Sequence, residues 1–405
     1  MPASSELQHP RSPSFDLDED RSASPTSGAR AGLRRAVAET FALADVAIDG
    51  DRRWDIQVRD PRFFQALASH GSLGLGNAYI EDWWDTPSLE AFFDKVYRAD
   101  LHYGRLTWSS RLHYVVSRLF NRQKISRAFE VGERHYDRGN RLYRAMLGPR
   151  MVYSSGYWTD GVETLAEAEE AKLDLICRKL DLKPGQRVLD IGCGWGCFGR
   201  WAAERHGVEV VGVTVSKEQL QHAREQDTNL PVETLLIDYR ELDGRFEPGS
   251  FDHVVSIGMM GHVGYKNYRT LMEVAHRQLA DDGLFLIHTM GANRSTTAAE
   301  PWIDRHIFPN GMAPSIPQVG AAIEHLFVLE DWHNFSTDYQ RTCLAWRDNF
   351  HARWSEIVDL YDERFFRLWT YYLCCFAGAF GARTLQTWDV VLSKVGGRGR
   401  YRSLR

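Results

Sequence analysis

The sequence predicts an α/β protein: a doubly wound parallel sheet with a helical N-terminal domain and a helical cap. Three observations support this. Apolar β-branched segments alternate with helical patterns between residues 187 and 289, amphipathic helical patterns precede them, and aromatic-rich helical patterns follow. The chain has 405 residues, of which 43% are hydrophobic, so it can bury a large core and its length suggests two domains. A net charge of −5 argues against general nucleic-acid binding.

The N-terminal part is predicted to be a disordered tail followed by a helical domain. Residues 1–32 are rich in Ser, Pro, Ala and charged residues and offer little apolar surface to bury. Residues 33–130 form the expected helical N-terminal domain, with apolar residues at helical spacing in these segments: 33–43, 61–69, 74–83 and 88–97.

A basic, aromatic segment ends this domain. Between residues 101 and 127 there are six basic residues and no acidic one, interleaved with aromatic and aliphatic side chains. Such a helix suits the surface of an anionic bilayer, and a solvated basic face packed on the next domain explains it equally well. The two explanations stay open.

The second domain is expected over residues 131–395, after a linker at 132–150. Its predicted strands are 187–191, 208–214, 232–237, 252–257 and 284–289. Ligands of open α/β sheets bind beyond the carboxyl ends of the strands. The residues that follow these strands are therefore the candidate site.

A glycine turn follows the first of these strands. Asp190 precedes Gly192, Gly194 and Gly196, and glycines there allow tight backbone conformations and a close approach to a ligand. The spacing differs from the dinucleotide motif, and a carboxylate suits a ligand that carries an ammonium group. S-adenosylmethionine fits this pattern better than NAD, although an ordinary strand-to-helix turn is the simpler alternative.

Further cofactor contacts are expected after the next two strands. Thr214 and Gln219 stand where many nucleoside-binding sheets place an acid for the ribose hydroxyls. Asp238, Tyr239 and Arg240 follow the third strand and are candidates to contact adenine.

The C-terminal third departs from a minimal nucleotide-binding fold. An apolar insertion at 301–311 and aromatic-rich helices at 337–360 and 364–380 suit the wall of a pocket for a long apolar substrate, and equally a plain helical cover. Residues 396–405 form a basic tail that is expected to contact phosphate head groups or to fray.

Cysteine usage and hydropathy place the protein in the cytoplasm, soluble or on a membrane surface. The six cysteines lack paired zinc-ligand spacing, so no metal is expected and reduced thiols are the default. The longest apolar stretch, residues 369–380, is shorter than the ~20 residues that span a bilayer.

Several segments together resemble the cyclopropane-fatty-acyl-phospholipid synthases, a family of class I, Rossmann-like methyltransferases that use S-adenosylmethionine. The segments that carry the resemblance are 71–76, 135–140, 188–196, 301–311 and 330–335. The resemblance implies methyl transfer to the cis double bond of a phospholipid acyl chain, followed by ring closure. It also implies that Tyr153 and Ser154 line the cofactor site with the residues named above, and a homodimer on the inner face of the membrane.

This chemistry requires a dry pocket and a base. Attack of an alkene on the sulfonium methyl leaves a carbocation, which water would quench and aromatic faces stabilise. A base then removes a proton from the added methyl group so that the ring closes. The resemblance implies that a bicarbonate ion is this base, held by a cysteine, a glutamate, a histidine and a tyrosine.

The catalytic set matches the family only in part. His288 and Tyr339 match the histidine and the tyrosine, and Ser155 stands in place of the cysteine. Gly261 replaces the glutamate and removes its carboxylate, which puts the bicarbonate in doubt, and the adjacent His262 is a candidate to take the proton instead. Phe376 replaces a further cysteine that the family often carries.

Three functions remain open after these departures. The chain forms cyclopropane rings, or it is a lipid methyltransferase that gives a methylene or methyl-branched product, or it binds S-adenosylmethionine and lipid without catalysis.

Overall fold

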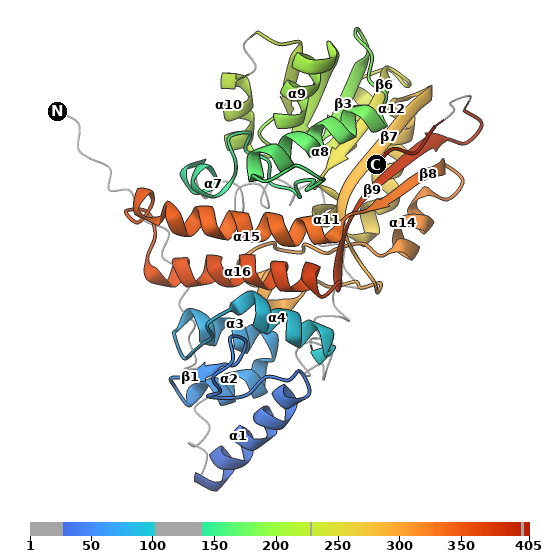
Figure 1. Cartoon of the computed structure of the whole chain (residues 1–405). Helices are drawn as coiled ribbons and strands as arrows, with labels where there is room; N and C mark the ends of the chain where they lie inside the picture. Colours follow the sequence, from blue (N-terminus) through green and yellow to red (C-terminus); the bar gives the residue numbers. More distant parts are fainter. Residues whose placement is uncertain (1–26, 102–139, 227–228, 398–400) are drawn as a thin grey trace, which may run out of the picture.

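A computed structural model describes residues 27–101, 140–226, 229–397 and 401–405 (Figure 1). Three expectations from the sequence fall largely outside these ranges: the basic segment at 101–127, the domain boundary near 130, and most of the 135–140 motif.

The N-terminal part consists of helices and one short strand pair. Its elements are α1 (Ser27–Ala42), β1 (Gln57–Val58), α2 (Arg62–His70), α3 (Ser72–Ile80), β2 (Trp84–Asp85) and α4 (Leu89–Arg98). All four expected helices are present. Helix α1 starts at Ser27, so the expected disordered tail, 1–32, is wrong for its last six residues. Ala and Arg favour helix there, and Val37 and Phe41 anchor α1 by packing into the core.

The second part is built on a seven-stranded sheet. Its strands are β3 (Arg187–Ile191), β4 (Glu209–Thr214), β5 (Val232–Leu236), β6 (Phe251–Ile257), β7 (Leu279–Ala292), β8 (Phe327–Asn334) and β9 (Leu385–Lys394). The order is β5-β4-β3-β6-β7-β9-β8, and the five strands predicted from the sequence pair in parallel.

Two strands that were not predicted from the sequence, β8 and β9, extend this parallel sheet at one edge, where β9 pairs antiparallel with both β7 and β8. Helix α16 leads into β9, and the chain enters this strand from the end that makes it run opposite to β7. This reversal matters for the site, because it sets β9 residues directly opposite β7 residues.

Helices cover the sheet and join it to the N-terminal part. They include α7 (Asn140–Met146), α8 (Leu165–Lys179), α9 (Cys197–His206), α10 (Lys217–Gln226), α11 (Met260–Val263), α12 (Tyr268–Gln278), α13 (Pro301–His306), α14 (Ile316–Ile323), α15 (Ser336–Ala352) and α16 (Glu363–Gly381), with 3₁₀ turns at Tyr239–Gly244, Tyr265–Asn267 and Trp354–Glu356. Helix α15 ends eight residues before the expected limit at 360.

Helices α15 and α16 lie side by side between the sheet and the N-terminal helices (Figure 1). Residues of α15 and α16 and of α1 to α4 belong to one hydrophobic core cluster. The expected cap is therefore an interior layer rather than a plain cover, since α16 packs on α15 on one side and on α4 on the other.

The C-terminal end is docked rather than frayed. Arg405 Nη1 donates to Asp331 Oδ2 at 2.8 Å and Ser403 Oγ donates to Asp331 Oδ1 at 3.1 Å. Lys179, at the end of α8, donates to the Leu404 carbonyl at 3.0 Å. Of the two alternatives for the basic tail at 396–405, fraying is thus wrong for residues 401–405, because a buried carboxylate offers their polar groups a partner.

Candidate active site

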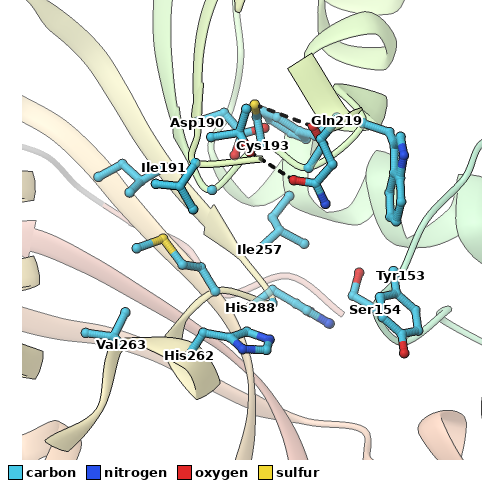
Figure 2. A pocket seen from close by; sticks show the side chains of 18 of the residues that line it. Tyr153, Ser154, Asp190, Ile191, Cys193, Gln219, Ile257, His262, Val263 and His288 are labelled. Atoms are coloured by element: carbon cyan, nitrogen blue, oxygen red, sulfur yellow. Dashed lines mark hydrogen bonds between the residues drawn. The ribbon is translucent and has the colours of Figure 1, made fainter. Parts of the chain in front are cut away.

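A pocket opens beyond the carboxyl ends of β3 to β7, the position that the sheet topology predicts. Figure 2 shows Asp190, Cys193 and Gln219 on one side of it, His288 and His262 on the opposite side, and Tyr153 and Ser154 on a third. The predicted site residues that line it are Tyr153, Ser154, Asp190, Gly192, Gly194, Thr214, Gln219, Asp238, Tyr239, Arg240, His262, His288 and Tyr339.

The glycine turn between β3 and α9 has the geometry that requires glycine. Gly192, Gly194 and Gly196 have φ values of 85°, 57° and 78°, all in the left-handed region. A Cβ on Gly192 would lie 2.8 Å from Met259 Sδ. Gly196 does not line the pocket; it is the residue before α9 and sets the start of that helix.

Asp190 provides a buried acceptor next to this turn. Its side chain is 1% exposed, and Oδ1 has no hydrogen-bond partner among the described residues. Burial raises the pKa of the Asp190 carboxyl to about 7, although the Lys172 ammonium opposes the shift. An unsatisfied carboxylate of this kind fits the ammonium of an amino-acid head group.

Thr214 and Gln219 form a second polar group in the pocket. Thr214 Oγ1 donates to Gln219 Oε1 at 2.9 Å, which leaves the Gln219 amide nitrogen as the donor for a ligand. Both side chains are buried. They are neutral hydrogen-bonding groups at the end of β4, as the sequence predicts.

The segment after β5 is rigidly held. The Asp238 carboxylate accepts hydrogen bonds from Arg240 Nε and Nη2, both at 2.7 Å, and from the Arg240 backbone N–H at 3.0 Å. Because Arg240 donates all three of these hydrogen bonds, the Asp238 carboxylate serves mainly to hold the loop in place. Tyr239 follows, buried, with the pKa of its hydroxyl raised by burial.

His288, near the end of β7, lies on the opposite side of the pocket. Its Nδ1 is 2.9 Å from Oδ1 of Asp389 on β9, and both side chains are almost completely buried. Burial lowers the pKa of His288, and the hydrogen bond and charge of Asp389 act against that shift. The imidazole is therefore neutral at neutral pH.

Aromatic rings wall the space between these two sides. The hydroxyls of Tyr153 and Tyr372 are hydrogen-bonded at 2.9 Å. The Tyr153 ring lies 5.3 Å from the Trp346 ring, and Phe308 makes an edge-to-face contact with Tyr372 at 5.8 Å. Tyr339 stacks on Phe380 at 4.4 Å. These rings make the pocket apolar beside His288.

Ser155 is not among the residues that line the pocket. Its side chain is fully buried, and its hydroxyl donates to the Gly156 carbonyl at 2.8 Å. The preceding residue, Ser154, lines the pocket instead and accepts a hydrogen bond from Lys172 Nζ at 3.1 Å. The expectation that Ser155 contacts the reacting groups is not supported by this geometry.

Gly261 leaves α11 without a carboxylate at this position. It lies in α11, and the atoms nearest to a Cβ added there are Met312 O at 3.8 Å and Met290 side-chain atoms at 3.9 Å. The pocket lining nearby is contributed by Met290, Phe308 and Phe376. Around Gly261 these thioether and phenyl groups do not fit a bound bicarbonate, because an anion needs donors or cations there.

His262 lies beside Gly261 in α11 and lines the pocket. Its ring is 5.2 Å from Phe308 in an edge-to-face contact. Burial lowers its pKa to about 4.

Two residues near the site were missed from the sequence: Asp389, the partner of His288, and Lys172, the partner of Ser154. A single acid inside the apolar run Trp388–Leu392 was a signal for the first, since a buried strand rarely carries an unpaired charge. A lysine on the buried face of α8 was the corresponding signal for the second. No group of three or more His, Cys, Asp or Glu side chains among the described residues is arranged to hold a metal ion.

The comparisons with known proteins agree with this geometry. The family model for mycolic acid cyclopropane synthetase matches residues 123–390. The cyclopropane-fatty-acyl-phospholipid synthase of Escherichia coli K12 is 47% identical over 362 residues, which cover 89% of this chain and 93% of that protein.

Solved structures give the same result. The cyclopropane synthase MmaA2 from Mycobacterium tuberculosis has a TM-score of 0.60 at 29% identity, covering 66% of this chain and 98% of that one. The mycolic acid cyclopropane synthase CmaA1, solved with SAH and CTAB, has a TM-score of 0.60 at 30% identity with the same coverage. The chain belongs to the mycolic acid cyclopropane synthetase family.

Proposed function

We propose that this protein transfers the methyl group of S-adenosylmethionine to the cis double bond of unsaturated phospholipid acyl chains and closes a cyclopropane ring. The observation that carries the proposal is the pocket itself. One side presents a buried carboxylate beside a glycine turn, and the other presents aromatic rings and a neutral histidine.

The cofactor side holds and orients the ligand. Asp190 would accept from the ammonium of the amino-acid head, and the Gln219 amide would donate to the ribose hydroxyls. Tyr239 and the loop fixed by the Asp238–Arg240 pair would hold the adenine when the cofactor is bound. When bound, S-adenosylmethionine supplies an electrophilic methyl group on a sulfonium.

The substrate side stabilises positive charge and excludes water. The faces of Tyr153, Phe308 and Tyr339 line the space where a carbocation on the acyl chain would form. A ring face attracts a cation without reacting with it, and the dry surroundings protect the cation from hydration. Met290 and Phe376 keep this part of the pocket apolar.

The test is mass spectrometry of phospholipid acyl chains after expression in a bacterium that lacks its own synthase. Gain of one methylene unit with loss of the double bond is the expected result. The same gain in mass with a double bond retained would indicate a methylene product. A saturated chain that carries a methyl branch would indicate a methyl-branched product. No change while the purified protein still binds S-adenosylmethionine would support the non-catalytic function.

We further propose that the enzyme works on the cytoplasmic face of a membrane, with the N-terminal helical domain (33–130) binding lipid. The substrate lies in a bilayer, and the 101–127 segment carries six basic residues among aromatic ones. None of the described helices is long and apolar enough to cross a bilayer. All six cysteines are free thiols, as in a reducing compartment.

Flotation with vesicles tests this membrane proposal. Binding to vesicles that contain phosphatidylglycerol, weakened by salt and lost when the six basic residues of 101–127 are neutralised, is expected. Equal binding to neutral vesicles would contradict it. A homodimer is proposed on the family resemblance, and light scattering of the purified protein at several concentrations tests it.

A further inference from the structure

We propose that His288 is itself the base that removes the proton during ring closure, and that Asp389 is the positioning residue that orients it. The inference rests on the proposed function. It assigns the proton to a side chain of this protein instead of a bound anion.

The sheet builds the pair. His288 and Asp389 face each other in the antiparallel register of β7 and β9, and their side chains meet at 2.9 Å between Nδ1 and Oδ1. A carboxylate only accepts hydrogen bonds, so Nδ1 carries the hydrogen and donates it. The lone pair of the neutral ring is then on Nε2, and His288 lines the pocket. In Figure 2 a nitrogen of the His288 ring is directed toward Ser154, another residue that lines the pocket.

Burial makes the orientation strict. Asp389 is completely buried, and its Oδ2 has no hydrogen-bond partner among the described residues. The carboxylate therefore depends on the imidazole N–H as its hydrogen-bond donor, and a flipped ring would leave a buried carboxylate without one. The tautomer and the direction of the ring are fixed before substrate arrives.

The surroundings of His288 keep its imidazole neutral, because the net effect on its pKa is a lowering. Burial lowers its pKa most, the hydrogen bond and charge of Asp389 on β9 raise it, and Lys172 on α8 lowers it. The Phe335 ring, 5.7 Å away, carries no charge. His288 is thus unprotonated at neutral pH, with a carboxylate ready to stabilise the imidazolium that forms.

Other titratable groups in the lining are less suited. Asp190 lies on the cofactor side, and Asp238 is held by Arg240. His262 has a pKa of about 4, set by burial with no carboxylate acting against it. His288, by contrast, has a carboxylate hydrogen-bonded to its Nδ1.

The step balances without a further reactant. The alkene π electrons form a bond to the methyl carbon, and the carbon–sulfur bond breaks with its electron pair left on sulfur. Nε2 of His288 takes a proton from the added methyl group, and the electrons of that C–H bond form the second ring bond. The products are the cyclopropane, neutral S-adenosylhomocysteine and a protonated His288, which releases its proton to solvent after product leaves.

Asp389→Asn is the test variant, because asparagine still accepts from Nδ1 but carries no charge. Its matched control is His253→Asn. His253 is another buried histidine, at the start of β6, whose Nδ1 accepts from the Leu284 N–H at 3.2 Å, a role that asparagine can take over. The assay is cyclopropane formation on vesicles containing unsaturated phospholipid, in buffer freed of carbon dioxide and again with added bicarbonate.

The expected results distinguish a base from a structural residue. For the unmodified protein, the rate falls on the acid side of its pH profile and is independent of bicarbonate. In Asp389→Asn the acid limb moves down by about one to three pH units, because the charge that raised the pKa of His288 is gone. The plateau rate of that variant falls by about 10²–10⁴, the range of general-base catalysis. S-adenosylhomocysteine affinity stays the same, and His253→Asn changes none of these readouts.

A second measurement needs no variant. Nitrogen-15 NMR of the histidine rings in the full-length protein with S-adenosylhomocysteine should show His288 in the Nδ1–H form at neutral pH. Activity that depends on added bicarbonate, an unmoved acid limb in Asp389→Asn, or His288 in the Nε2–H form would overturn the inference. Failure of the unmodified protein to make any cyclopropane would instead overturn the proposed function.

Discussion

Lys179 Nζ donates to Asp331 Oδ2 at 2.5 Å, and the two side chains are 0% and 3% exposed. This ion pair joins the end of α8 to β8, the outermost strand of the sheet. Tyr401, Ser403 and Arg405 add hydrogen bonds to the same carboxylate. One buried acid therefore holds together a helix, an edge strand and the end of the chain.

Asp331→Ala should lower the free energy of unfolding by about 3–5 kcal/mol, because Lys179 would remain buried without its carboxylate. Urea denaturation measures the change. Asp181→Asn is the control, since the Lys183–Asp181 pair is exposed and such pairs contribute about 0–1 kcal/mol. A loss below 1 kcal/mol for Asp331→Ala would show that the pair contributes little.

The same carboxylate predicts acid sensitivity. Burial opposes ionisation of Asp331, yet hydrogen bonds from Arg405 and Lys179 lower its pKa to about 2, below the ordinary value of 3.8. A lowered pKa means that the stability from this group is present above pH 3.8 and is lost as the pH falls toward 2. The free energies of unfolding of the unmodified protein and of Asp331→Ala should converge over that pH interval. A difference that stays constant with pH would contradict the lowered pKa of Asp331.

Gly378→Ala should separate the effect of packing from that of helix propensity. A Cβ on Gly378 of α16 would overlap Phe93 Cβ on α4 and lie 2.9 Å from the Asp94 nitrogen, so a loss of about 1–3 kcal/mol is expected. Gly320 in α14 has no atom within 4 Å of its added Cβ, and Gly320→Ala should raise stability by about 0.5–1 kcal/mol. Thermal unfolding measures both, and equal effects would show that α16 can move away from α4.

Asp190→Asn should weaken S-adenosylhomocysteine binding about 10- to 100-fold, the range for losing a hydrogen bond to a charged group. Since burial raises the pKa of Asp190 to about 7, the affinity of the unmodified protein should increase as the pH rises through 7 and then level off. The variant should lack this pH dependence. Calorimetry across that range is the measurement, with Glu209→Gln as the control at an exposed acid on β4. Parallel pH profiles for all three proteins would rule out the assigned contact.

Gly261→Glu should not improve the enzyme. The first side-chain atom fits, but the carboxylate would enter an apolar region beside Met290 and would be buried without a donor. The rate should stay unchanged or fall, with or without bicarbonate, and Gly261→Ala should remain near the unmodified rate. A many-fold gain for the glutamate variant in bicarbonate would mean that the natural site is an impaired anion site.

Strand and turn chemistry could be predicted without the structure because it is local. The run before Asp190 and the alternating glycines specify a buried strand and a left-handed turn, and both are present where expected. The same applies to Thr214 and Gln219, which sit at fixed distances from a recognisable strand end.

Contacts between distant segments were not predictable in this way. Ser155 and Ser154 are neighbours in sequence, yet only Ser154 lines the pocket, since the backbone direction at that point depends on packing against α8 and α15. The docking of residues 401–405 depends on Asp331, about seventy residues earlier in the chain.

By itself, the sequence determined the parallel core of the sheet, the glycine turn with its acid, and the family. Periodicity and turn chemistry act over a few residues and leave a readable pattern. Only the tertiary structure decided that β9 enters the sheet antiparallel and brings Asp389 to His288, 101 residues apart. Strand pairing is chosen by the burial of whole faces and by the path of the connecting helices, so no local pattern encodes which acid meets which histidine.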